Sequence, residues 1–193
     1  MDKKLFIETL NKGTHKLKLR KLLIASCLKN PSYIPILLKN IQQVDDKNST
    51  FSTRILELAC KENLAIIIPY LDEFSETLKL LKQEASIRAC AKICELLMVA
   101  NFTNHDKTYI ASINHSHQEK IIETGFDWMI SNQPTAIQAY TMHSLYLLGL
   151  KHDWIHPELV LILERAIPTG SIGLVNRARK IIKAIQTKKM FKL

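Results

Sequence analysis

Histidines and a glutamate gather in one polar stretch of the chain. His105 precedes a His-x-His-x-Glu pattern formed by His115, His117 and Glu119. Imidazole nitrogens and carboxylate oxygens are ligands that zinc accepts, and the two later histidines would point the same way on an extended segment. A long polar loop also collects histidines without binding a metal. We therefore expect no structural metal here and assign no cofactor.

Each of the two tryptophans follows an aspartate, in the segments GFDWMI and HDWIHPE. The pairing resembles the HEAT-like DNA glycosylases of alkylation repair, a family that places tryptophans and a catalytic aspartate in a basic concave cleft. The resemblance implies a candidate DNA site, with the arginines as phosphate contacts, made of Trp128, Trp154, Asp127, Asp153, Arg177 and Arg179. Read without the resemblance, Trp128 packs between helices and Asp153 caps the helix that follows it.

Motifs of the common enzyme classes do not occur in the sequence. It has no GxGxxG, GxxxxGK[ST], GxSxG, HExxH or DDxxD pattern. Asp45 and Asp46 form an acidic pair, but adjacent carboxylates in a polar turn suit turn and cap chemistry as well as acid–base catalysis. The sequence therefore favours a binding protein over an enzyme, and a small lyase or hydrolase stays as an alternative.

The elements that must position these residues are helices. Only five glycines and six prolines interrupt 193 residues, and runs such as KLRKLLIASCL place apolar residues three and four apart. No segment sustains the strict alternation of a strand. The fold class is therefore expected to be all-α. The predicted helices cover residues 3–11, 15–29, 33–44, 50–62, 66–82, 84–101, 117–131, 134–150, 156–167 and 171–187.

An internal repeat organises these helices. Arg20, Arg54 and Arg88 lie 34 residues apart, and Pro35 and Pro69 repeat the same interval in the intervening helices. Two different helices thus repeat together. The unit is a helical hairpin, with a proline-bearing helix, a short polar turn and a second helix that opens near an arginine.

The segment IPILLKNIQQVDDKNSTFSTRILELAC resembles the HEAT consensus, and IIPYLDEFSETLKLLKQEASIRACAKICELL resembles it again. The resemblance implies a right-handed α-α superhelix, an armadillo-like solenoid of about five helical hairpins that forms one domain over residues 1–193. In that family a turn aspartate and a second-helix arginine form a ladder between repeats. The ladder would be carried here by Asp45 or Asp46 with Arg54 and Arg88.

The later repeats depart from this pattern. Gln138 and Asn176 occupy the arginine place, at intervals of 50 and 38 residues. About sixteen extra residues must therefore lie between the third and fourth hairpins, and the polar stretch 101–116 is where they fit. We expect this stretch to be a loop that projects from one edge of the stack.

The apolar runs and the four cysteines indicate in which cellular compartment the protein is expected. The longest apolar run, LAIIIPYL, is far shorter than the ~20 residues of a membrane span. The first residues carry acids and no continuous apolar segment of a secretory signal. We therefore expect a cytoplasmic protein that does not enter a membrane. Its cysteines are expected to be reduced and buried between helices; they are Cys27, Cys60, Cys90 and Cys94.

Charge and fold together suggest a function. Residues 1–40 carry a net charge of +7, residues 41–136 carry −4 and residues 137–193 carry +6, within a total of +9. Basic ends suit anionic partners, but we favour the simpler explanation that these lysines solvate the outer faces of the terminal helices. Stacked hairpins line a continuous surface that binds other molecules. We expect a scaffold that binds a protein partner on its concave face, with DNA binding or DNA repair as the alternative.

Overall fold

The computed structural model describes residues 1–13 and 16–188, and within them the chain forms eleven α-helices and no strand. The predicted all-α class is confirmed for this part of the chain. Two 3₁₀-helices, η1 (Pro31–Tyr33) and η2 (Leu64–Tyr70), and one π-helix, η3 (Val99–Thr103), complete it. The α-helices are α1 (Lys3–Asn11), α2 (Leu17–Lys29), α3 (Ile34–Gln42), α4 (Lys47–Glu62), α5 (Leu71–Leu78), α6 (Glu84–Met98), α7 (Lys107–Ser112), α8 (His115–Ile130), α9 (Thr135–Leu148), α10 (Ile155–Ala166) and α11 (Ile172–Thr187).

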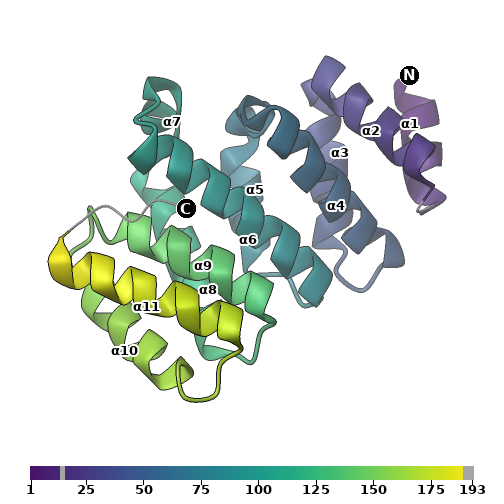
Figure 1. Cartoon of the computed structure of the whole chain (residues 1–193). Helices are drawn as coiled ribbons and strands as arrows, with labels where there is room; N and C mark the ends of the chain where they lie inside the picture. The colour runs from purple at the N-terminus through teal and green to yellow at the C-terminus, as the bar shows by residue number, and fades with distance from the viewer. Residues whose placement is uncertain (14–15, 189–193) are drawn as a thin grey trace.

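The helices pack in two rows (Figure 1). In one row, α2 contacts α4, α4 contacts α6, α6 contacts α9 and α9 contacts α11. In the other, α3 contacts α5 and α5 contacts α8. Contacts between α3 and α4 and between α8 and α9 join the two rows, while α1 packs on α2 and α4, and α10 packs on α9 and α11. Of the two hairpins that the repeat predicts, α3 packs on α4, but α5 packs on α3 and α8 more than on α6. We call α2, α4, α6, α9 and α11 the front row.

Asparagines and prolines set the turns between the rows. Asn30 ends α2 and accepts a hydrogen bond from the backbone of Ser32, and Asn63 ends α4 in the same way. Each asparagine thereby opens a 3₁₀-helix. Pro35 follows in the first turn of α3, but Pro69 lies inside η2. Because proline cannot donate an intrahelical hydrogen bond, the predicted helix 66–82 is divided into η2 and the shorter α5.

A continuous core of buried apolar side chains extends from Phe6 in α1 to Ala184 in α11. The four cysteines lie in this core as free thiols, in agreement with the sequence-based prediction. Burial raises the pKa of the Cys27 and Cys94 thiols to about 12, because a thiolate loses its hydration in the core. No helix in the described residues is long and apolar enough to cross a membrane.

The stretch 101–116 is not the projecting loop that we predicted. The π-helix η3 continues α6, and α7 follows after a short turn (Figure 1). Tyr109 and Ile113 are buried in the core, and Asp106 caps the first turn of α7 by accepting a hydrogen bond from the backbone of Thr108. The prediction was wrong because a six-residue helix is too short to display a helical period among polar neighbours.

Replacement of Tyr109 tests whether this segment is a packed element. Its side chain is 8% exposed, whereas that of its neighbour Ile110 is 51% exposed. We expect Tyr109→Ala to lower the free energy of unfolding by about 3 kcal/mol, because it leaves a cavity, and Ile110→Ala to change it little. Urea unfolding followed by circular dichroism measures both. If both substitutions change the free energy of unfolding equally little, Tyr109 is not packed in the core and α7 does not contribute to it.

Candidate functional site

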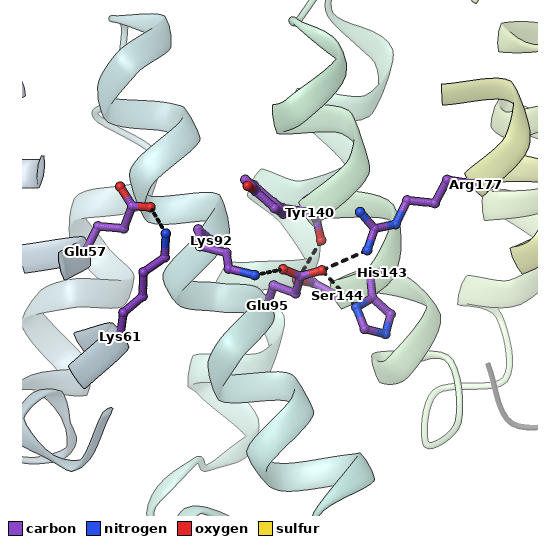
Figure 2. A network of polar contacts seen from close by, with 8 residues as sticks. All are labelled: Glu57, Lys61, Lys92, Glu95, Tyr140, His143, Ser144 and Arg177. Carbon is purple, nitrogen blue, oxygen red and sulfur yellow. Dashed lines mark hydrogen bonds and ion pairs between the residues drawn. The ribbon is translucent and has the colours of Figure 1, made fainter. Parts of the chain in front are cut away.

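Two carboxylates are buried in the front row. The side chain of Glu57 in α4 is 0% exposed and that of Glu95 in α6 is 1% exposed. A buried carboxylate is costly unless cations and hydrogen-bond donors surround it. Both glutamates are surrounded in this way, and Figure 2 shows their side chains with several of the partners. We call these residues, together with their cationic partners, the charged ladder.

Glu57 joins α4 to α6. Arg88 donates a hydrogen bond to its Oε2 atom over 2.8 Å, and Arg54 donates to the same oxygen from one turn earlier in α4. The Lys61 ammonium lies 2.8 Å from Oε1 as an ion pair. Burial alone raises the pKa of Glu57, but the neighbouring cations outweigh it and hold the pKa below its ordinary value. The carboxylate is therefore ionised at neutral pH.

Glu95 joins three helices. Its Oε2 atom lies 2.6 Å from the ammonium of Lys92, and its Oε1 atom lies 2.9 Å from His143 Nδ1 in α9 and 3.3 Å from Arg177 Nη2 in α11 (Figure 2). Because a carboxylate only accepts, His143 Nδ1 is the donor. Burial raises the pKa of Glu95, but the hydrogen bonds from His143 and Lys92 outweigh it and lower the pKa overall.

The arginine ladder differs from the one that the HEAT resemblance implies. We expected Arg54 and Arg88 to bond to a turn aspartate, but among the described residues both pair with Glu57. Asp46 instead caps α4 by accepting a hydrogen bond from the backbone of Asn48, and Asp45 is exposed. The reason is distance along the helix, since Arg54 lies two turns inside α4 and one turn from Glu57.

The structure places the two tryptophans in different surroundings. Trp128 is buried in α8, where it lines a small cavity with Cys94 of α6. Trp154 is exposed and stacks on Phe126 with 5.5 Å between ring centroids, in a separate cavity with His115. The indoles therefore do not meet in one cleft, as base recognition by a glycosylase-like site would need.

The charged members of the same candidate set are also dispersed. Asp127, Asp153 and Arg179 have exposed side chains, and Arg177 lies on Glu95. Asp153 is not the cap of α10, because the N-cap residue is Trp154. The structure thus brings Arg177 into the charged ladder and leaves the two aspartates outside it.

The histidines have separate partners. His117 is buried; its Nδ1 accepts from the backbone of Asn114 over 3.3 Å, and its Nε2 lies 2.7 Å from Asp72 in α5. His115 is exposed and pairs with Glu119. Within the described residues no three His, Cys, Asp or Glu side chains are close enough to hold a metal ion. His117 therefore links α8 to α5 and closes the capping box at the start of α8.

The chemistry that the charged ladder presents to solvent is cationic. Both oxygens of Glu95 are engaged and His143 is buried, so neither group is placed to act on a substrate. Arg54, Arg88 and Lys61 keep about a third of their side-chain surface exposed.

Comparison with known proteins gives no relative of this chain. It matches no family model, no curated protein and no solved structure at a significant level.

Sequence reasoning missed Glu57 and Glu95, although the sequence contains a signal for them. Each is a single acid inside an apolar helical run, in RILELAC and AKICELLMV. An acid on the apolar face of a helix must be paired with a cation from the same or a neighbouring helix. The four-residue and three-residue spacings to Lys61 and Lys92 identify one such cation each, but the contribution of Arg177 requires the tertiary fold.

Replacement of Glu95 tests the role of the charged ladder in stability. Its folded pKa lies below the ordinary glutamate value of about 4.3, so ionisation stabilises the fold above that pH and this stabilisation is lost as the pH falls through the folded pKa. We expect Glu95→Gln to lower the free energy of unfolding at pH 7 by about 2 kcal/mol. Below pH 4 the variant should lose less stability than the wild type.

The matched control is Glu76→Gln. Glu76 also pairs with two lysines, Lys79 and Lys120, but it lies on the surface, where water and salt screen such pairs. Urea unfolding at a series of pH values measures all three proteins. Parallel pH profiles of the wild type and Glu95→Gln would contradict the assignment of Glu95 as an ionised, paired group.

Proposed function

We propose that the chain is a binding scaffold whose front row forms the binding face of a short HEAT-like solenoid and receives a protein partner. The observation that carries this proposal is the charged ladder, which runs across successive helices of one row with its acids buried and its cations partly exposed. A continuous face made by one helix from each hairpin is the usual binding surface of such arrays.

Preorganisation supports the proposal. Long cationic side chains normally lose rotamer freedom when they bind a partner, and this loss weakens association. In the charged ladder, Glu57 already holds Arg54 and Arg88, and Glu95 already holds Lys92 and Arg177. These cations are therefore fixed before a partner arrives, and less entropy is lost when it binds.

Nucleic acid is the second candidate partner. The exposed cations Arg179, Lys180 and Lys183 on α11 favour it, because clustered positive charge attracts phosphates. The burial of Trp128 argues against a DNA-repair reading, because a buried indole offers no face to an extruded base. This alternative is therefore one of electrostatic DNA binding, and nuclease treatment distinguishes it from a protein partner.

Position-specific photo-crosslinking in the native cell tests the scaffold. Ala85 is exposed on α6 in the front row, and Ala65 is exposed on η2 outside that row. A photoreactive amino acid at position 85 should yield a protein adduct that nuclease does not remove, whereas the same residue at position 65 should yield little. Equal adducts at both positions would contradict a front-row binding face, and adducts that nuclease abolishes would favour nucleic acid.

A further inference from the structure

The 34-residue repeat brings three arginines together in one cavity. Arg20 of α2, Arg54 of α4 and Arg88 of α6 line a cavity of about 130 Å³. Phe51, which is buried, forms part of its wall together with the side chains of Thr50 and Ala85. Because each arginine occupies the same place in its repeat, the stacking of α2, α4 and α6 puts all three guanidinium-bearing residues at one site. We call this site the arginine cavity.

Positive charge exceeds negative charge at the arginine cavity. Arg54 and Arg88 share the single carboxylate of Glu57, which also pairs with Lys61 outside the cavity lining. Arg20 adds a third positive charge to the lining, and in the part of the chain that the structure describes it makes no ion pair. Its guanidinium keeps all five donors for a ligand. The arginine cavity therefore has unused capacity for a negatively charged group.

We propose that the arginine cavity binds a side-chain carboxylate from an acidic segment of a protein partner. This inference rests on the proposed scaffold function and names the chemistry of its partner. A guanidinium matches a carboxylate with two parallel hydrogen bonds, and such charge-assisted bonds are among the stronger polar contacts in proteins. The remaining donors of Arg54 and Arg88 complete the cradle while Glu57 holds these side chains in place.

Apolar surface next to the arginine cavity favours a protein segment over a nucleic acid. Leu17 lies one turn before Arg20 on the same face of α2, and its side chain is 55% exposed. Phe51 closes the cavity from α4. An acidic segment that also carries apolar side chains covers both kinds of surface, whereas a phosphate backbone leaves the apolar part unpaired. The buried Glu57 also lowers the positive potential that a polyphosphate requires.

The front row offers this segment a second contact. Beyond the arginine cavity, Lys92 and Arg177 flank Glu95 and retain part of their surface, and the Lys92 ammonium lies 4.8 Å from the centre of the Tyr140 ring. Two cations there face one carboxylate. An extended acidic segment that lies across α2, α4, α6 and α9 therefore meets two separate cationic positions, and the arginine cavity is the stronger of the two.

Replacement of Arg20 is the direct test, because this residue does not support the buried glutamates. The probe is a fluorescently labelled poly-glutamate decapeptide, titrated in low salt and followed by anisotropy. We expect Arg20→Gln to weaken its binding about tenfold, as loss of one charge-assisted contact predicts, and Arg20→Lys to restore part of the affinity. The matched control Lys18→Gln removes the same charge from the opposite side of α2 and should change binding less than about twofold.

Several outcomes would overturn the inference. Equal loss of binding in Arg20→Gln and Lys18→Gln would show that only overall charge matters. Failure of the decapeptide to bind, with binding of a short DNA duplex that depends on Arg20, would assign the cavity to nucleic acid. If the crosslink from position 85 to a protein persists in Arg20→Gln, the scaffold proposal stands and the acidic-segment inference fails. An unchanged unfolding midpoint of Arg20→Gln shows that the variant is folded.

Discussion

The structure depends on the requirement that a buried carboxylate be paired. Apolar contacts between helices are non-directional, whereas an ion pair fixes which atoms must meet. Glu57 fixes the position of α4 relative to α6, and Glu95 fixes α6 relative to both α9 and α11. The same two residues hold the exposed ends of their cationic partners. One constraint thus sets both the register of the front row and the placement of the charges that face solvent.

Much of the fold follows from the sequence, and the failures have physical causes. The helical period and the rarity of glycine and proline predict ten of the helices, and the 34-residue repeat predicts the packing of α3 on α4. The repeat does not predict that α5 packs on α3 and α8 more than on α6. The repeat could not show that Pro69 divides one predicted helix, because Pro35 sits harmlessly in a first turn. Helix α7 escaped detection because Tyr109 is its one buried residue and Ile113 follows as its C-cap, and two buried positions in so short a helix define no period.

The candidate site was less predictable than the fold. Tryptophan and histidine attract attention because of what their side chains are able to do, but the sequence does not say which of them face solvent. Trp128 is buried, and both ring nitrogens of His117 make structural contacts, one with the backbone of Asn114 and one with Asp72 in α5. Arg177, chosen as a phosphate contact, lies instead on Glu95. Single acids within apolar runs would have been the better guide, because a buried charge requires a partner whatever the function of the protein.

The arginine cavity depends on the same constraint. Three guanidinium groups on adjacent helices repel one another, and without a buried acid between them the side chains of Arg54 and Arg88 would turn away into water. Glu57 offsets that repulsion from beneath and leaves the outward donors free. Because one carboxylate balances only part of the positive charge, the cavity remains short of negative charge. In the proposed complex, an acidic partner supplies the missing negative charge. The ion pairs that hold α4 to α6 thus also leave the excess positive charge that a carboxylate ligand would neutralise.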